Sequence, residues 1–276
     1  LLSGEINKIS KTKNNYIWLS TTGSTGSPFK FPVDKNSKSM RRAIHLISYK
    51  LFNKKIYDKT GIFWRDVRSN IFFKIKEFML RRYWFPIYDT TTRKNIISDK
   101  HFIKYNELII KNNIKQIEGY VSAIIRYCKV IEKYNLETPK IKFVVTGGET
   151  LDSRSRAYIE KILDTRIFNR YGGSEISLIA HEDIKHKHKL KIMKVRLYLE
   201  SKNNEFIVTD FTNSAIPFIR YKIGDKGTIS GNYINSISGR VNDEFKISST
   251  EYLNSHFFHK MLREYVEQHR SLAQMT

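Results

Sequence analysis

Residues 21–28 read Thr21-Thr22-Gly23-Ser24-Thr25-Gly26-Ser27-Pro28, an unbroken run of small, hydroxylic or imino residues. Glycine lets the backbone turn sharply and expose its N–H groups. Successive N–H groups and hydroxyl donors together form a nest that binds phosphate oxygens. The Gly-Lys-[Ser/Thr] ending of a Walker A loop is absent. Taken alone, the stretch fits a phosphate-binding loop and an ordinary surface turn equally well.

The sequence on both sides of this loop alternates between strand and helix patterns. A strand at Tyr16–Leu19 is expected to run into the loop. Downstream we expect helices at Ser37–Leu51, Lys104–Asn113, Tyr120–Tyr134 and Ser153–Leu163, and short strands at Ile141–Val145 and Arg166–Asn169. Ile71–Tyr83 is a further amphipathic stretch that bears basic residues. This order indicates an α/β sheet with ligand-binding loops at the strand ends.

From Lys191 onward the pattern favours strands, followed by one last helix. The expected strands are Leu190–Glu200, Glu205–Thr209, Ile216–Tyr221 and Gly227–Ser230, and the expected helix is Asn254–Gln268. Short strands at this spacing are typical of an antiparallel meander or a small barrel.

Two of the expected helices have an apolar face. In the first, Met40, Ile44, Ile47 and Leu51 share one side. In Tyr120–Tyr134, Cys128 lies on the apolar stripe, which predicts a core residue and not a nucleophile. Because Cys128 is the single cysteine, the sequence excludes an internal disulfide and a cysteine-cluster zinc site.

The composition indicates a folded cytoplasmic protein. Hydrophobic residues make up 40% of the chain, enough for a packed core. Lys or Arg interrupts every long apolar stretch, so none approaches the roughly 18 residues that a transmembrane helix needs. The start of the chain has no signal-peptide pattern, and a single cysteine fits a reducing compartment. There is no initiator Met, so we expect a longer parent protein.

The net charge of +22, from 49 basic and 27 acidic residues, raises the question of a polyanionic partner. A concentrated basic face attracts nucleic acids, and anionic membrane surfaces for the same reason. The basic residues are dispersed from Lys8 to Arg270, however, and the densest cluster, 184–189, carries no groove-reading motif. We therefore expect an ordinary solvated surface and no specific nucleic-acid partner. A basic nucleic-acid-binding protein is the lesser alternative.

His181 and Glu182 are followed by His186 and His188, a combination that could suggest a metal site. No spacing in this stretch matches a known zinc site. The prediction is therefore that these histidines are structural or solvated.

Four further motifs follow the opening loop in a fixed order. They are Thr146-Gly147-Gly148-Glu149, Asn169-Arg170-Tyr171-Gly172-Gly173-Ser174-Glu175, Arg220-Tyr221-Lys222-Ile223-Gly224-Asp225 and Gly239-Arg240-Val241-Asn242-Asp243. Together the five motifs resemble those of the adenylate-forming superfamily, which includes acyl-CoA synthetases, luciferase-like enzymes and peptide-synthetase adenylation domains. Gly119–Ser122, Val208–Asn213 and Phe29 after Pro28 are similar to its phenylacetate–CoA ligase-like branch, which includes capsular-polysaccharide biosynthesis proteins.

The resemblance covers nearly all of residues 15–247. It implies the core of the large N-terminal domain of such an enzyme, an α/β fold of mixed sheets with flanking helices and a β-rich segment near the C-terminus. We expect an α/β nucleotide-binding core at residues 1–190, a β-rich subdomain of the same core at 191–238, and a hinge with the start of a truncated C-terminal domain at 239–276. The family's N-terminal region and most of its C-terminal domain have no counterpart here.

The resemblance implies that a carboxylate and ATP form an acyl-adenylate and pyrophosphate, after which coenzyme A, another thiol or an amine accepts the acyl group. Such a step needs no protein nucleophile. It needs the carboxylate held in line with the α-phosphate and the developing charge neutralised. The predicted cofactors are ATP and Mg²⁺, and the predicted partner is a small-molecule carboxylate.

By resemblance, each candidate residue serves one part of the nucleotide. Thr21, Thr22, Gly23, Ser24, Thr25, Gly26 and Ser27 would hold the β- and γ-phosphates. Gly147, Gly148, Glu149, Tyr171 and Gly172 would surround the adenine, and Asp225 and Arg240 would contact the ribose and its neighbourhood. Glu175 would bind Mg²⁺, which prefers hard oxygen ligands. Thr22, Glu175 and Arg240 would be the catalytic residues.

Each of these residues also has a structural alternative. Glu175 could be an acid at a helix N-terminus, Tyr171 a core residue, Asp225 a turn residue and Arg240 a surface cation. Two departures from the family pattern limit the prediction of an active ligase. Asn242 stands where the hinge usually has Asp, although Asp243 follows, and Lys260 lacks the motif that surrounds the family's C-terminal catalytic lysine. The missing ends support the alternative of a non-catalytic nucleotide-binding or assembly protein.

Overall fold

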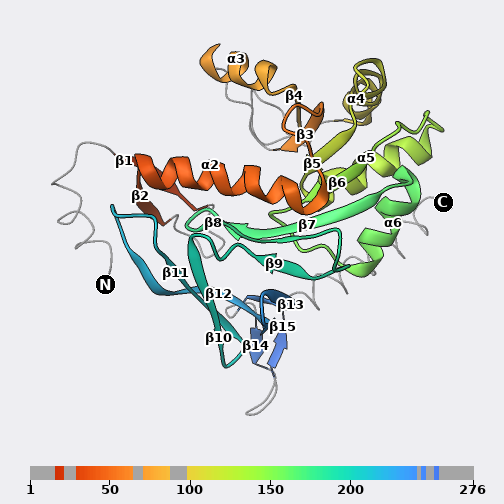
Figure 1. Cartoon of the computed structure of the whole chain (residues 1–276). Coiled ribbons are helices and arrows are strands. Elements are labelled where there is room, and N and C mark those ends of the chain that lie inside the picture. Colours follow the sequence, from red (N-terminus) through yellow and green to blue (C-terminus); the bar gives the residue numbers. More distant parts are fainter. Residues whose placement is uncertain are drawn as a thin grey trace.

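An eleven-stranded sheet runs through the structure and joins a parallel half to an antiparallel half (Figure 1). The computed structural model describes residues 16–21, 29–64, 71–87, 98–240, 244–246 and 252–254. The strands lie in the order β10-β11-β12-β13-β9-β8-β7-β6-β5-β3-β4. Two small hairpins, β1–β2 and β14–β15, stand apart from this sheet. The predicted α/β fold with mixed sheets is confirmed.

The parallel half is built from strand–helix units. Its strands are β3 (Thr60–Trp64), β4 (Arg82–Pro86), β5 (Gln116–Gly119), β6 (Phe143–Thr146) and the first half of β7 (Arg166–Gly173), and the helices between them are α3 (Ile71–Met79), α4 (Asp99–Lys111), α5 (Val121–Lys133) and α6 (Ser153–Leu163). Each of these helices ends close to where the next parallel strand begins, as expected of crossover connections. Helix α6 has the bounds that the sequence predicted.

Both faces of this parallel half are covered. Val144 and Ile167 belong to the core cluster that includes buried residues of α4, α5 and α6. Phe143 and Val145 point the other way, toward Phe52 of the short 3-10 helix η2 (Lys50–Phe52). Strands buried on both faces read as continuous apolar runs, which is why the stretch ending at Thr146 was recognisable from the sequence.

Strand β7 belongs to both halves of the sheet. Its residues 166–169 pair in parallel with β6, and its residues 170–173 pair antiparallel with β8 (Ser177–Glu182). A Cβ atom on Gly172 would lie 2.1 Å from the backbone oxygen of Ser177, so only glycine allows the two strands to approach this closely.

The antiparallel half contains the predicted meander. Its strands are β9 (Leu190–Ile192), β10 (Leu197–Lys202), β11 (Glu205–Asp210), β12 (Phe218–Ser230) and β13 (Tyr233–Arg240), and β10 to β13 pair in chain order. Two expected bounds differ. The stretch 190–200 is divided by a turn, and the segments at 216–221 and 227–230 are one long strand with register shifts.

The first hairpin leads directly into a long helix. Strands β1 (Tyr16–Ser20) and β2 (Lys30–Asp34) pair antiparallel, and α2 (Lys35–Tyr49) follows without a loop. In Figure 1, α2 lies across the middle of the molecule, next to the antiparallel part of the sheet. The other small hairpin is β14 (Glu244–Lys246) with β15 (Tyr252–Asn254).

The predicted apolar face of α2 is confirmed only in part. Ile44 is buried and Leu51 is half-buried, but Met40 and Ile47 are 37% and 39% exposed. The polar residues Ser37, Arg41 and Ser48 are buried instead, and Arg41 donates to the backbone carbonyls of Ser174 and Glu175 in the turn between β7 and β8. Hydropathy alone gives no sign of that contact.

Helix α5 agrees with its prediction. It begins at Val121, directly after Tyr120, and Cys128 is fully buried in the core. Burial raises the pKa of this thiol far above its usual range, so Cys128 is a core residue and not a nucleophile. The predicted helix at Asn254–Gln268 lies outside the described residues after Asn254, the last residue of β15. None of the described helices is long and apolar enough to cross a bilayer.

His181 has a structural role, as predicted. Its ring is 2% exposed, stacks on Phe52 with 4.7 Å between ring centroids, and donates a hydrogen bond through Nδ1 to the carbonyl oxygen of Glu182. The Glu182 carboxylate pairs with the Arg156 guanidinium at 2.5 Å. Two of the four side chains of the suspected metal motif, His181 and Glu182, therefore have partners within the fold.

His181 should make the folded state sensitive to acid. Burial lowers its pKa to about 3, below the value of about 6.5 in the unfolded chain. The unfolded chain therefore takes up this proton first, so the contribution is present above pH 6.5 and is lost as the pH falls toward 3. When the pH is lowered from 7 to 5, the unfolding free energy should fall in both proteins. The fall should be about 2 kcal/mol smaller in His181→Phe than in the unsubstituted protein.

Denaturant titrations at the two pH values measure this difference. The exposed His101→Phe variant is the control, and it should keep the full pH dependence because His181 is intact. An equal loss of stability in His181→Phe and in the unsubstituted protein would contradict the assignment.

Candidate functional site

The predicted phosphate loop is the connection of the β1–β2 hairpin. The Thr21 amide donates to the carbonyl of Phe29, and the Phe29 amide donates to Thr21 Oγ1, each at 2.9 Å. Thr22, Gly23, Ser24, Thr25, Gly26 and Ser27 lie outside the described residues. The structure therefore shows how the two ends of the loop are closed.

Asp34 fixes the base of this hairpin. One carboxylate oxygen accepts the Ser37 amide at 2.7 Å and thereby caps α2. The other oxygen accepts the amide and the hydroxyl of Ser214, at 2.7 and 2.9 Å. Burial raises the pKa of Asp34, but these hydrogen bonds outweigh it and hold the pKa below its usual value. The hairpin is thus joined to a segment 180 residues further along the chain.

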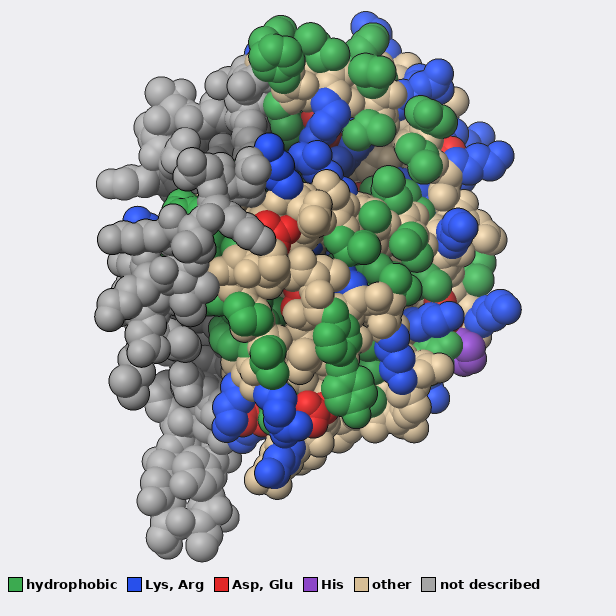
Figure 2. Space-filling model, turned by 60° about the vertical axis from the view of Figure 1, so that its left-hand side comes forward, with side chains coloured by type: hydrophobic (Ala, Val, Ile, Leu, Met, Phe, Trp, Pro, Cys, Tyr) green, Lys and Arg blue, Asp and Glu red, His purple; other side chains and the backbone are tan. Residues whose placement is uncertain are grey.

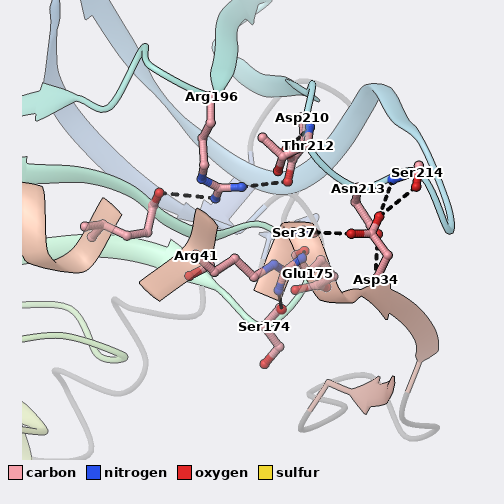
Figure 3. Close-up of polar contacts among 12 residues, drawn as sticks. Asp34, Ser37, Arg41, Ser174, Glu175, Arg196, Asp210, Thr212, Asn213 and Ser214 are labelled. Carbon is pink, nitrogen blue, oxygen red and sulfur yellow. Dashed lines mark hydrogen bonds and ion pairs between the residues drawn. The ribbon is translucent and has the colours of Figure 1, made fainter. Parts of the chain in front are cut away.

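Arg41 joins the same helix to the turn that contains Glu175. Its guanidinium donates to the carbonyl oxygen of Ser174 at 2.9 Å and to that of Glu175 (Figure 3). Burial lowers the pKa of Arg41 to about 10, with the neighbouring Arg196 acting in the same direction, so Arg41 stays charged at neutral pH. The turn connects β7 to β8, so Glu175 is not at a helix N-terminus.

Arg196 and Asp210 form a fully buried ion pair beside Arg41. Their side chains are both 0% exposed, and Arg196 Nη1 lies 2.7 Å from an Asp210 oxygen. The second Asp210 oxygen accepts the amide and the hydroxyl of Thr212, at 2.9 and 2.6 Å. Asn213 then donates to the carbonyl of Pro32 in β2. Residues 210–214 therefore form a strap between the antiparallel sheet and the hairpin.

These contacts make one network from four parts of the chain: the hairpin, α2, the Glu175 turn and the strap (Figure 3). The sequence had singled out Val208–Asn213 by resemblance only, and it had not identified Arg41 or Arg196. For Arg41, the available signal was an arginine among the polar residues of an amphipathic helix. Hydropathy assigns such an arginine to the surface, so the signal was not used.

Tyr171, Asp225 and Arg240 come together at the junction of the two sheet halves. The Tyr171 hydroxyl donates to the Asp225 carboxylate at 2.6 Å, and the ring packs against Phe206. Asp225 lies within β12, not in a turn, and its backbone is paired with that of Arg240 in β13. Three candidate residues separated by up to 69 positions (240 minus 171) are therefore neighbours through one hydrogen bond and one strand pairing.

The turn after β6 lies beside this junction. Gly147 packs so closely on Arg170 that a Cβ atom would lie 2.7 Å from that side chain. Gly148 has a φ of +78°, and its missing side chain would meet the ring of Tyr120 at 2.8 Å. Glycine is therefore required twice, once for space and once for the left-handed backbone. Tyr120 in turn stacks on Trp64 at 4.0 Å, at the carboxyl end of β3.

Glu149 has an additional structural role. Its two oxygens accept the amide and the hydroxyl of Ser122, at 2.7 and 2.8 Å, and so cap α5. A contact between Glu149 and adenine stays a prediction.

A buried carboxylate, Glu118, supports this edge of the sheet. It pairs with Lys54 at 2.5 Å and with Arg170 at 3.2 Å. Burial raises the pKa of Glu118, but Lys54 and then Arg170 outweigh it, so the group stays ionised. Burial, followed by Arg170, also lowers the pKa of the nearby His45 to about 4. The sequence did not single out these residues.

Of the described candidate residues, Gly147, Gly148 and Tyr171 lie at the carboxyl ends of parallel strands. Asp225 and Arg240 lie in β12 and β13 of the antiparallel half and are connected to this edge through Tyr171. In open α/β sheets, ligands bind at this edge. Gly147, Gly148, Tyr171 and Asp225 occupy one part of it, while the hairpin with Thr21 is connected to the Glu175 turn through α2. Such an arrangement suits a ligand with an aromatic base at one end and phosphates at the other.

Comparison with known proteins gives one match in sequence. Protein CapK from Staphylococcus aureus is 28% identical over 253 residues, covering 85% of this chain and 55% of CapK. No protein-family model matches the chain. At this identity and coverage the chain is a distant homologue of CapK.

Solved structures with the same fold are adenylate-forming ligases. A 2-hydroxyisobutyryl-CoA ligase in complex with 2-HIB-AMP and CoA superposes with a TM-score of 0.64 at 14% identity, over 87% of this chain and 56% of the ligase. Escherichia coli MenE, with a bound analogue of OSB-AMS, gives 0.53 at 13% identity, over 86% and 50%. The chain has the fold of the adenylate-forming ligases. It spans about half the length of these relatives.

Within the adenylate-forming ligase fold, the Arg196–Asp210 pair should be important for stability. Asp210→Ala leaves Arg196 buried and charged without its partner, which typically costs about 3–5 kcal/mol of unfolding free energy. Glu200→Ala is the control, because the partner of Glu200, Arg220, is 56% exposed and such pairs contribute about 0–1 kcal/mol. Urea titration followed by tryptophan fluorescence measures both. Equal midpoints for the two variants would show that the buried pair is not needed.

Proposed function

We propose that the protein to which this chain belongs uses ATP to activate a carboxylate as an acyl-adenylate. The observation that carries this proposal is the hydrogen bond between Tyr171 and Asp225, together with the pairing of Asp225 and Arg240. It joins three motifs of the superfamily at the ligand-binding edge of the sheet. A hydroxyl–carboxylate pair at that edge is suited to a nucleoside, with the Tyr171 ring beside the base and the Asp225 carboxylate accepting from ribose hydroxyls.

The phosphate end of the nucleotide would lie between the hairpin loop and the Glu175 turn. Asp34 and Arg41 hold these two elements to the same helix, so their separation is set by backbone and buried hydrogen bonds. Positioning of this kind is most of what an in-line displacement at phosphorus requires of a protein. The Thr21–Ser27 loop would hold the β- and γ-phosphates.

Glu175 would hold Mg²⁺. The donor chemistry fits, because the side chain is a hard oxygen ligand beside Gly173, where a Cβ atom would lie 3.1 Å from a carboxylate oxygen. Its backbone carbonyl is already engaged by Arg41, which fixes the turn without using the carboxylate. The ion would neutralise phosphate charge when bound. Arg240 would contact the nucleotide from the strand next to Asp225.

The distant homology to CapK supports a role in the biosynthesis of capsular or other surface polysaccharides. A thiol such as coenzyme A would then accept the acyl group, because the structural relatives include a ligase solved with CoA. Trp64 and Tyr120 provide a flat aromatic surface next to Gly148, and we assign to it one wall of the site for the carboxylate.

Removal of either key carboxylate should impair adenylation. In the full-length protein, Glu175→Ala and Asp225→Ala should each lower ATP–pyrophosphate exchange by at least about tenfold, equivalent to about 1.4 kcal/mol. Glu107→Ala, an exposed carboxylate on α4, should leave exchange unchanged. A parallel thermal-shift titration with Mg-ATP reports binding.

The two measurements separate the possible results. Unchanged exchange in both variants of an active protein would rule out these assignments. A thermal shift without any exchange in the unsubstituted protein would instead indicate a nucleotide-binding protein that does not form adenylates.

A further inference from the structure

Helix α3 has its apolar side turned to solvent. Ile71, Phe72, Ile75, Phe78 and Met79 are 62%, 77%, 51%, 84% and 69% exposed. At 100° per residue, these five positions fall within an arc of about 120°, one continuous side of the helix. A surface helix of a globular protein normally buries this side.

The opposite side of α3 is attached to the protein by a buried charge. The Glu77 side chain is 5% exposed and accepts a hydrogen bond from Trp84 Nε1 at 2.8 Å. Arg82 lies 3.3 Å and Lys76 3.0 Å from its carboxylate oxygens. The Phe73 ring also packs on Trp84, with 5.4 Å between centroids. Directional contacts therefore fix the helix with its apolar side outward.

Basic residues lie beside the apolar side. Lys74 falls next to the arc, and the exposed Arg81 follows the helix, whereas the ammonium group of Lys76 is paired with Glu77 at 3.0 Å. Figure 2 shows hydrophobic and basic side chains next to one another at the top of the molecule, the level at which Figure 1 places α3. Lysine stems can lie along an apolar surface while the ammonium group reaches the polar phase.

We propose that α3 binds the surface of an anionic lipid bilayer. The arc is convex and apolar and would enter the boundary between head groups and acyl chains, while Lys74 and Arg81 would meet lipid phosphates. The charge complementarity selects lipid as the occupant, because these two cations lie beside the apolar side of the helix. A helix of nine residues gives weak and reversible attachment, and the proposal does not depend on the adenylation chemistry.

Vesicle co-sedimentation of the full-length protein tests this inference. Binding is compared on vesicles of phosphatidylcholine alone and of phosphatidylcholine with phosphatidylglycerol. The protein should bind the anionic vesicles, with an affinity that falls as salt is added. Phe78→Ser with Met79→Ser should weaken this binding by at least about tenfold, because two apolar side chains that would enter the bilayer are replaced by polar ones.

Paired charge variants distinguish a site on α3 from general attraction. Lys74→Gln with Arg81→Gln should weaken binding by about tenfold. The control, Lys187→Gln with Lys189→Gln, removes the same charge from exposed positions outside α3 and should have a much smaller effect. Thermal unfolding is measured for every variant, so that a loss of folding is recognised.

Three results would overturn the proposal. They are no binding of the unsubstituted protein to anionic vesicles, equal losses in the two pairs of charge variants, and unchanged binding of the Phe78→Ser, Met79→Ser variant. Sedimentation velocity provides a further check. A self-association that this variant abolishes, without lipid binding, would identify a second copy as the occupant.

Discussion

Strand β7 is the constraint on which the rest of the structure depends, because one strand serves two kinds of sheet. Its first half continues the parallel ladder from β6, and its second half pairs antiparallel with β8. The change takes place at Arg170–Gly172, within one of the sequence motifs. Arg170 contacts the Gly147 turn, Tyr171 reaches Asp225, and Gly172 lets β8 approach. The part of the candidate site that we propose for adenine is therefore assembled where the sheet changes from parallel to antiparallel pairing.

Buried charge is the second organising feature. Glu118 with Lys54 and Arg170, Glu182 with Arg156, and Asp210 with Arg196 are all largely removed from water. Such pairs add little net stability compared with apolar packing, but each is costly to break on one side. Their value here is directional. The N–H donors of a guanidinium point in fixed directions, so only a few arrangements of oxygen atoms can accept from them. Arg41 and Arg196 therefore define where the Glu175 turn and the strap must lie.

The sequence predicted the α/β fold, the superfamily, the helices α2, α4, α5 and α6 and the parallel strands β6 and β7. Buried parallel strands read as continuous apolar runs, and amphipathic helices have a periodic pattern. The sequence placed α6 without error and Cys128 in the core. It was right only in part for α2, where Arg41 and Ser48 are buried and Met40 and Ile47 are not. Hydrogen bonds to distant carbonyls decide that orientation, and they have no signature in local hydropathy. Strand β5 was missed because two of its four residues, Gln116 and Glu118, are buried polar residues that interrupt an apolar run.

The contacts of the hairpin also have a consequence for the order in which the chain folds. Asp34 needs Ser214, 180 residues later, and Arg41 needs Ser174, 133 residues later. Such distant pairings form late, because loop closure must precede any gain from the contact. During synthesis, the hairpin cannot make these contacts until the ribosome has made the strap. The hairpin is thus translated before the Glu175 turn and the strap, but it reaches its place only after both.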